Sequence, residues 1–290
     1  SEKTKDYPIT PVAFTAVRLT DNFWLPRLLT NTGVTIPIAF RQSEETGRIK
    51  NFEVAGGMTP GTFCSIYPFD DSDVFKIMEG AAYSLMIKPD PVLEAYLDSL
   101  IHKISLAQEP DGYLYTNRTI LGDSAHEWAG TERWQHVNEH SHELYNVGHM
   151  YEAAVAHFMA TGKRTFLDIA IKNADLVCRD FGWGKIEQYP GHQEVEIGLV
   201  KLYRTTGDKR YLDMAQFFLD VRGPDGWEYN QAHLKVVDQR EAVGHAVRAL
   251  YMFSGMIDVG SLTTNPAYME AIGALWKNVL NKKTYVTGGI

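Results

Sequence analysis

The feature that most constrains this chain is an apolar pattern with the period of an α-helix, repeated in pairs. In each unit, an apolar stretch of helical period, a short turn and a second such stretch follow one another. The units span residues 80–104, 152–177, 196–221 and 247–279. Such a unit is an αα-hairpin, which buries its apolar face only against neighbouring hairpins. The pattern therefore predicts an all-α protein.

Two of the turns between paired helices share the dipeptide Thr-Gly, at Thr161-Gly162 and Thr206-Gly207. A glycine after the last helical residue readily adopts the left-handed conformation that ends a helix. The two glycines are 45 residues apart (207 − 162), in the range of repeats built from helical pairs.

Stacked hairpins form either an open solenoid or a closed toroid. The unequal units, and the long polar and aromatic connections at 108–135 and 222–239, favour the toroid, in which such loops gather at one end around a pocket. We count about nine helices, where a six-hairpin barrel needs twelve. The sequence thus predicts an incomplete (α/α)6 barrel over residues 21–290, truncated at its C-terminal end. A Pro-containing extended lead, residues 1–20, precedes it, and Asp21 is the expected helix N-cap.

Charge and hydropathy exclude some classes of partner. The net charge is −8 and no run of Lys or Arg occurs, which argues against nucleic acid or an anionic membrane as the main partner. No stretch has the length of a transmembrane helix. The polar start at Ser1 fits a periplasmic or secreted protein whose signal was removed; otherwise we expect a cytoplasmic one. The composition leaves a homodimer open.

Histidines recur at equivalent positions of the repeats, before or at the start of a helix: His142, His192 and His245. In a helical toroid these helix ends face one rim, where imidazoles can bind sugar hydroxyls. The alternative is that each is a helix-end histidine satisfied by the backbone. The recurrence favours the binding interpretation, and His149 follows His142 on roughly the same helix face.

Carboxylates are frequent, but their spacing selects no catalytic pair. A glycosidase usually needs two of them across the scissile bond. Three aspartates precede a helix and are expected to stabilise its N-terminus: Asp70, Asp71 and Asp73. Three glutamates flank the histidines and could orient them: Glu143, Glu194 and Glu196.

Two further features each allow two interpretations. The segment AQEPDGYLYT, residues 107–116, either lines a sugar cleft or forms a tight loop with packed tyrosines. Cys64 and Cys178 are expected to be two buried free thiols rather than one disulfide. No cluster has the spacing of a metal site, so no metal ligand is predicted in this chain.

Several segments together resemble glycoside hydrolase family 127, the β-L-arabinofuranosidases. In order, they are DSDVFK, EGAAYSL, AQEPDGYLYT, SHELYNVGHMYEAAVA, GHQEVEIGLVKLY, DQREAVGHAVRA and YVTGGI. The resemblance implies an (α/α)6 barrel followed by β-sandwich domains. It also implies a retaining hydrolase with a zinc-bound cysteine nucleophile and a glutamate acid/base, acting on β-L-arabinofuranose in plant-type glycans.

Carried over residue by residue, the resemblance gives this chain a binding role. His142, His192 and His245 match the family's contacts to arabinofuranose in the −1 subsite, and Gln42 matches a glutamine there. The acid/base and the zinc ligands match no residue up to Ile290, and neither Cys64 nor Cys178 stands in a matching motif. We therefore expect no catalytic or metal residue here, zinc in the complete protein, and no activity from this chain alone.

Two rival functions remain from the sequence. One is an unsaturated glycuronyl hydrolase of α/α-barrel type, which uses an aspartate and needs basic residues for the substrate carboxylate. The other is a non-catalytic helical-repeat scaffold or sugar-binding protein.

Overall fold

A computed structural model describes residues 6–290, and the described chain is helical without a β-strand, apart from one isolated bridge between Phe181 and Ile186. The all-α prediction is confirmed. The helices are α1 (Trp24–Thr30), α2 (Ile36–Glu45), α3 (Arg48–Ala55), α4 (Asp71–Ile87), α5 (Pro91–Ala107), α6 (Thr116–Leu121), α7 (Glu143–Thr161), α8 (Thr165–Asp180), α9 (Val195–Thr206), α10 (Lys209–Asp220), α11 (Ala246–Thr263) and α12 (Pro266–Asn278).

The four predicted hairpins are the pairs α4/α5, α7/α8, α9/α10 and α11/α12. Nine helices within residues 6–290 have ten or more residues: these eight and α2, which continues from α1 through the π-helical turn Asn31–Thr35. Gly162 and Gly207 follow α7 and α9 with φ of 73° and 75°, the left-handed conformation expected of them.

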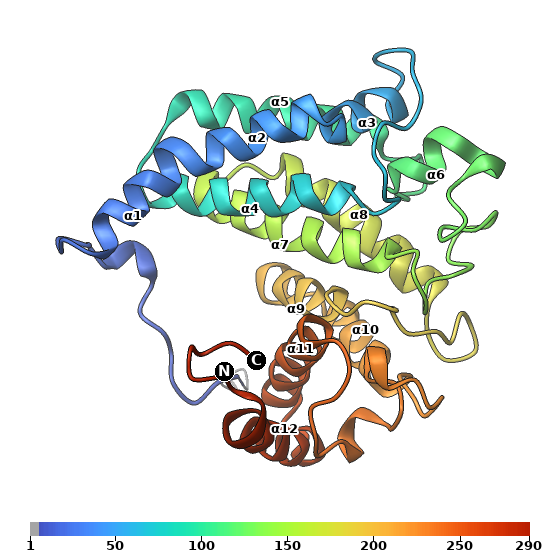
Figure 1. The fold of residues 1–290 in the computed structure, drawn as a ribbon. Helices are drawn as coiled ribbons and strands as arrows, with labels where there is room; N and C mark the ends of the chain where they lie inside the picture. Colours follow the sequence, from blue (N-terminus) through green and yellow to red (C-terminus); the bar gives the residue numbers. More distant parts are fainter. Residues whose placement is uncertain (1–5) are drawn as a thin grey trace.

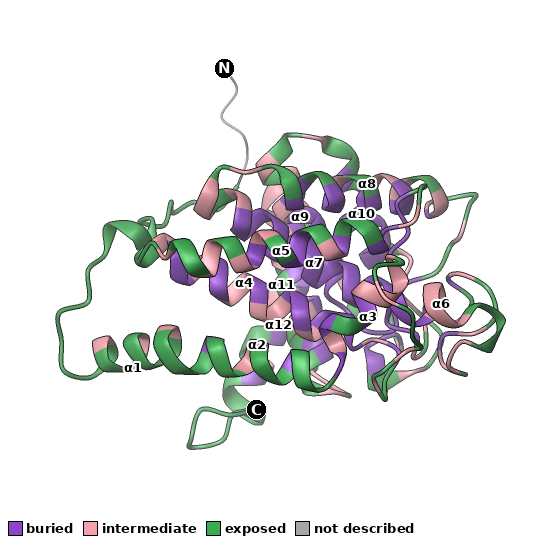
Figure 2. Cartoon of the chain, turned by 90° about the horizontal axis from the view of Figure 1, so that it is seen from above, coloured by how far each residue is buried: buried purple, intermediate pink, exposed green. Residues whose placement is uncertain are grey.

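The hairpins form an inner and an outer row that curve around an axis (Figure 1). In the inner row α4 packs on α7, α7 on α9 and α9 on α11, while each outer helix covers its own partner. Helix α7 is buried over most of its length, whereas the outer helices show an exposed face (Figure 2). This arrangement is that of part of an (α/α)6 barrel.

A pair of glycines sets how closely α7 and α9 approach. A Cβ at Gly148 would lie 2.7 Å from Glu194 Cγ and 2.8 Å from Val195 N, and one at Gly198 would lie 2.6 Å from Gly148 O. Only hydrogen fits at such a crossing. The close contact brings the start of α9 beside the first turns of α7.

From residue 6 up to α1, the described part of the N-terminal lead is non-helical apart from one 3₁₀ turn at Phe14–Ala16, and residues 1–5 of the predicted lead lie outside the described residues. Tyr7 donates a 2.6 Å hydrogen bond to Asp258 on α11, and Phe14 packs edge-on against Tyr83 on α4. Asp21 accepts hydrogen bonds from the backbone N–H groups of Phe23 and Trp24 at the start of the first helix. The N-cap residue of α1 is Phe23, however, so the predicted N-cap lies two residues too early.

The connection expected at 108–135 is partly helical, because α6 lies within it. Asp71, in the first turn of α4, accepts bonds from both the backbone N–H (2.8 Å) and the hydroxyl (2.5 Å) of Thr116. This buried carboxylate anchors the start of α6. The sequence pattern did not reveal this short helix. No helix among residues 6–290 is long and apolar enough to cross a membrane.

Candidate functional site

The structure brings the three predicted histidines together. His142 immediately precedes α7, His192 lies in the loop before α9, and His245 is the N-cap of α11. Ring centroids are 5.4 Å apart for His142 and His192, and 6.2 Å apart for His192 and His245. The N-terminal ends of three inner helices thus form one histidine cluster. Its role in sugar binding stays a prediction.

His142 adopts a backbone conformation that is unusual for a residue with a side chain. Its φ of 56° and ψ of 24° are left-handed, and its ring stacks on Phe69 with centroids 4.4 Å apart. The flanking residues are fixed: Tyr115 donates a 2.5 Å hydrogen bond to the Ser141 carbonyl, and the Ser141 hydroxyl donates one to Glu143. Strain of this kind persists only where the surroundings impose it, and it is frequent at functional sites.

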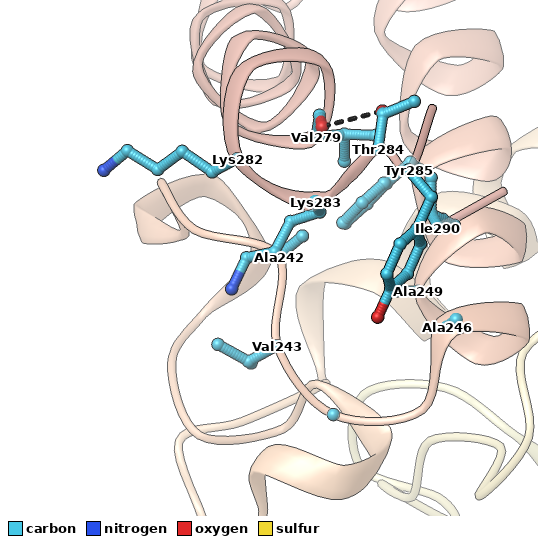
Figure 3. Close-up of a pocket in the computed structure, with 12 residues that line it drawn as sticks. Ala242, Val243, Ala246, Ala249, Val279, Lys282, Lys283, Thr284, Tyr285 and Ile290 are labelled. Carbon is cyan, nitrogen blue, oxygen red and sulfur yellow. Dashed lines mark hydrogen bonds between the residues drawn. The ribbon is translucent and has the colours of Figure 1, made fainter. Parts of the chain in front are cut away.

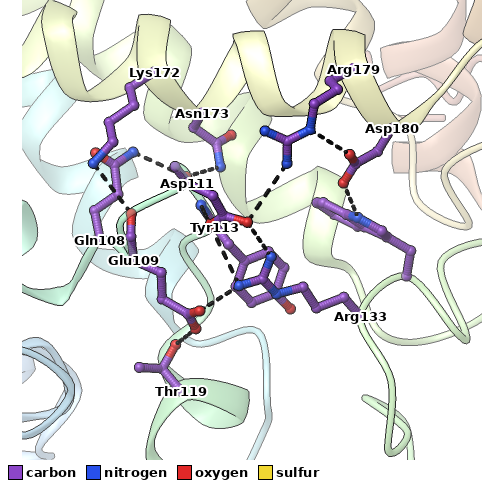
Figure 4. Close-up of polar contacts among 12 residues, drawn as sticks. Gln108, Glu109, Asp111, Tyr113, Thr119, Arg133, Lys172, Asn173, Arg179 and Asp180 are labelled. Carbon is purple, nitrogen blue, oxygen red and sulfur yellow. Dashed lines mark hydrogen bonds and ion pairs between the residues drawn. The ribbon is translucent and has the colours of Figure 1, made fainter.

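The segment 107–116 proves to be a tight loop with packed tyrosines, the second of its two interpretations. Tyr113 and Tyr115 are fully buried, and Tyr113 donates a 2.6 Å hydrogen bond to Glu143. The surface of the loop is held by ion pairs from Arg133 to Glu109 and Asp111 (Figure 4). The loop therefore positions the residues around His142 rather than lining a cleft.

Two of the imidazoles present opposite hydrogen-bonding atoms. His192 Nδ1 lies 2.8 Å from the Gln193 carbonyl, which can only accept, so Nδ1 carries the proton and Nε2 is an acceptor. His245 Nδ1 accepts from the backbone N–H of Arg248 at 3.5 Å, so its Nε2 carries the proton and donates. Burial lowers the pKa of His192 to about 3 and that of His142 well below its usual value, so both are neutral at physiological pH.

Behind the histidine cluster lies a buried charged network that the sequence did not predict. His149 Nδ1 is 3.3 Å from Glu194 Oε1 and 3.9 Å from Glu152 Oε2. The Lys201 ammonium contacts Glu152 and lies 3.3 Å from Glu79 Oε1. Burial raises the pKa of Glu194 well above its usual value and lowers that of His149 to about 2. The members come from three inner helices, α4, α7 and α9, or the loop before α9, so their spacing in sequence carries no signal.

Three members of this network could share a metal ion. His149, Glu152 and Glu194 each offer one ligand atom, and these atoms lie within 4.8 Å of one another. Imidazole and carboxylate suit several divalent metals. The spacing in sequence carries no sign of this group, because Glu194 reaches the other two residues only through the packing of α9 on α7. Lys201 already pairs with Glu152.

The cysteines do not supply the zinc site that the family resemblance implies. Cys64 is exposed and contacts the Thr62 carbonyl, which corrects the expectation that both thiols are buried. Cys178 lies on the outer helix α8, where burial raises the pKa of its thiol to about 12. Both are free. Neither side chain is part of the histidine cluster, so the residues of this chain do not fit a cysteine-ligated zinc.

Gln42 lies outside the histidine cluster. It is exposed on α2, donates a 2.9 Å hydrogen bond to Glu45, and lines a surface cavity of about 440 Å³ together with Asp73 and Lys76. The Lys76 ammonium lies 4.8 Å from the centroid of the Tyr145 ring, and that ring is 4.3 Å from His192. A sugar contact by Gln42 stays a prediction.

Sequence reasoning missed the aromatic side chains that surround the histidines. They come from the loops before the inner helices and from α7 and α11: Phe69, Trp128, Tyr145, Trp227, Tyr229 and Tyr251. The available signal was the aromatic content of the two long connections. It did not show which rings turn toward the histidines.

The segment YVTGGI, at 285–290, lies beside the start of α11. A cavity of about 420 Å³ is lined by Tyr285 and Ile290 together with Gly244 and Ala246, the two neighbours of His245 (Figure 3). Within the segment, the Tyr285 N–H donates a 2.7 Å hydrogen bond to the Gly289 carbonyl and closes a turn. Ile290 thus lines the same cavity as the two neighbours of His245.

Comparison with known proteins decides the family. A model of the β-L-arabinofuranosidase GH127 catalytic domain matches residues 16–290. The chain belongs to the GH127 family. A curated relative, the non-reducing end β-L-arabinofuranosidase of Bifidobacterium longum subsp. longum, is 39% identical over 267 residues, which cover 83% of this chain and 40% of the relative.

Solved GH127 structures agree with the fold. A GH127 β-arabinofuranosidase shares 55% identity and superposes with a TM-score of 0.94 over 98% of this chain and 46% of that protein. A GH127 β-L-arabinofuranosidase from Geobacillus stearothermophilus T6 shares 38% identity, with a TM-score of 0.88 over 94% and 46% of the two chains. The chain thus spans less than half the length of these relatives. Membership of GH127 argues against both rival interpretations, the unsaturated glycuronyl hydrolase and the scaffold.

Proposed function

We propose that this chain forms the arabinofuranose-binding wall of a retaining β-L-arabinofuranosidase that removes non-reducing terminal units from plant-type glycans. The observation that carries the proposal is the opposite polarity of two imidazoles in one cluster: His192 Nε2 accepts and His245 Nε2 donates, with His142 beside them. The glycans are the expected partner, and a periplasmic or secreted location and a homodimer remain expectations.

Neutral imidazoles of opposite polarity suit sugar hydroxyls, because each hydroxyl both donates and accepts. One hydroxyl of the furanose donates to His192 and another accepts from His245. Such bonds orient the ring without requiring charge on the sugar. A substrate carboxylate, which the glycuronyl hydrolase would bind, gains little from His142 and His192 because burial keeps both uncharged.

The bond-breaking groups are proposed to come from outside this chain. Two acids near the histidines are already engaged: Glu143 accepts from Tyr113 and Ser141, and Glu152 pairs with Lys201. A third, Glu194, lies behind the cluster beside His149, and burial raises its pKa well above the usual value. In the family resemblance the acid/base glutamate follows TGGI within a few residues, and Ile290 lies beside the neighbours of His245. Zinc, when bound by the complete protein, would stabilise a cysteine thiolate as nucleophile.

Kinetics of the complete protein on an aryl β-L-arabinofuranoside test the proposal. His192→Ala is expected to lower kcat/KM by about tenfold, because a neutral hydrogen bond contributes about 1 kcal/mol and the loss leaves polar groups unpaired. His102→Ala is the matched control, since His102 is an exposed histidine on the outer helix α5. Absence of turnover by the wild-type protein, or equal kinetics for the two variants, would contradict the proposal.

A further inference from the structure

Eight aromatic side chains form a closed circuit of ring contacts, which we call the aromatic collar. Successive ring centroids around it are 4.4 to 6.3 Å apart. In order, its members are His142, Phe69, Trp128, His140, Trp227, Tyr229, His245 and His192. The contact between His192 and His142 closes the circuit, so the histidine cluster is one arc of a larger ring of side chains.

The remaining arc is carried by loops. Phe69 precedes α4, Trp128 and His140 lie between α6 and α7, and Trp227 and Tyr229 lie between α10 and α11. These three connections are distant in sequence but lie at one end of the fold, the end to which the inner helices present their N-termini (Figure 1). We call these five residues the loop arc.

The loop arc is extended by Tyr67. Its ring is nearly parallel to those of Phe69 and Trp128, with interplanar angles of 4° to 13° among the three. The three centroids are 5.5, 6.1 and 6.3 Å apart. Three rings at nearly equal separations cannot form one linear stack, so they present parallel faces side by side or offset.

The exposure of these rings differs from that of the core aromatics. Tyr67 and Tyr229 are 47% and 44% exposed, and Trp128 and Trp227 are half-buried, whereas core rings such as Tyr113 and Phe166 are buried to within 1%. Rings that served only to hold loops together would be expected to bury their faces. Grouped aromatic surface that remains accessible beside a candidate site is typical of ligand binding.

We propose that the loop arc binds the sugar unit to which the terminal arabinofuranose is linked, with Trp128 and Trp227 as the main stacking faces. This inference rests on the proposed function. In the proposed function, the histidine cluster holds the terminal furanose. The loop arc contacts this cluster at both of its ends, Phe69 with His142 and Tyr229 with His245, and its indole rings stay partly accessible. It therefore offers a stacking face to the next unit of the glycan. The ligand class is a neutral oligosaccharide whose C–H face covers an indole ring, since stacking needs no charge on the sugar.

Affinities for two non-hydrolysable ligands test this inference on the complete protein. One is methyl 1-thio-β-L-arabinofuranoside, and the other is an S-linked disaccharide with the same terminal unit. Trp128→Ala and Trp227→Ala are each expected to weaken disaccharide binding about tenfold, and to change methyl thioglycoside binding less than about twofold. Trp128→Phe should retain most of the affinity. Trp183→Ala is the control, because Trp183 is 63% exposed and packs on Phe217 outside the collar.

The outcomes separate this inference from the function on which it rests. An equal loss of affinity for the two ligands in the Trp128 and Trp227 variants would overturn it, because the two rings would then serve only to shape the histidine cluster. Wild-type protein that binds the two ligands with equal affinity would also overturn it and leave the proposed function standing. Wild-type protein that binds neither ligand would defeat the proposed function itself.

Discussion

His142 and His192 lie with their ring centroids 5.4 Å apart, although they precede different inner helices. The close crossing of α7 and α9 at Gly148 makes this possible, because any side chain there would meet Glu194 and the backbone of Val195. The distance between the two imidazoles is therefore set by the packing of two helices.

Replacing Gly148 by Ala should push α7 and α9 apart. We expect a loss of about 2 kcal/mol in the free energy of unfolding, because the new methyl group meets backbone as well as side chain. Gly80→Ala is the control: a Cβ at Gly80, inside α4, meets nothing within 4 Å, so that variant should gain about 0.5 kcal/mol. Denaturant unfolding measures both. A Gly148→Ala protein as stable as Gly80→Ala would refute the crossing geometry.

The left-handed backbone at His142 predicts that a glycine variant is more stable than an alanine variant, the reverse of their usual order in a helix. His142→Gly and His142→Ala both remove the imidazole, so their difference reports the backbone alone. Glycine is expected to be more stable by about 1 kcal/mol, because only glycine adopts positive φ without strain. At Met159, exposed within α7, the order should be the usual one, with alanine the more stable. Alanine equal to or better than glycine at position 142 would show that the backbone is unstrained.

The buried charged network should depend on Lys201. Burial alone would lower the pKa of this lysine, but the carboxylates of Glu152 and Glu79 raise it above its usual value. Lys201→Met leaves these acids without their cation and should lower the free energy of unfolding by about 2 kcal/mol. This is less than the loss of a fully buried ion pair would cost, because Lys201 is partly exposed. Lys209→Met, which breaks an exposed pair with Asp213, should cost less than about 0.5 kcal/mol. Equal free energies of unfolding of the two variants in denaturant would show that Lys201 does not stabilise the network.

His149 should make the fold sensitive to acid. Burial lowers its pKa from 6.5 in the unfolded chain to about 2. Between these values the unfolded chain binds a proton that the folded protein does not, so stability falls as pH falls, by about 1.4 kcal/mol per unit. His149→Gln removes this contribution. The free energy of unfolding of the variant, measured relative to that of the wild type, should therefore be higher by about 2 kcal/mol at pH 5 than at pH 7. Parallel stability curves for wild type and variant would contradict this, because they would show that the folded protein binds a proton at His149 as readily as the unfolded chain does.

The fold was predictable to a large extent because its signals are local. Helical periodicity in each hairpin, and the glycines at 162 and 207, depend on neighbouring residues only. The short helix α6 was missed because the buried carboxylate of Asp71 anchors it from another element. The cysteine expectation failed for Cys64 because composition does not reveal that its loop lies at the surface.

The histidines could be selected from the sequence because they recur at equivalent positions of the repeats. The network of His149, Glu194 and Lys201 could not, since its members meet only after three helices have packed. The same holds for the loop arc: Trp128 and Trp227 lie on different connections, and no pattern within either one fixes the direction of its ring.

The most direct test of the account is the replacement of His245 by Asn in the complete protein. Asparagine can still accept a backbone hydrogen bond at the N-cap of α11, so the melting temperature should be retained. It removes the Nε2–H that the furanose is proposed to use, and kcat/KM for an aryl β-L-arabinofuranoside should fall at least about fivefold. Both quantities are measured on one preparation. A variant with wild-type kcat/KM per folded molecule would contradict the assignment of the histidine cluster to the sugar.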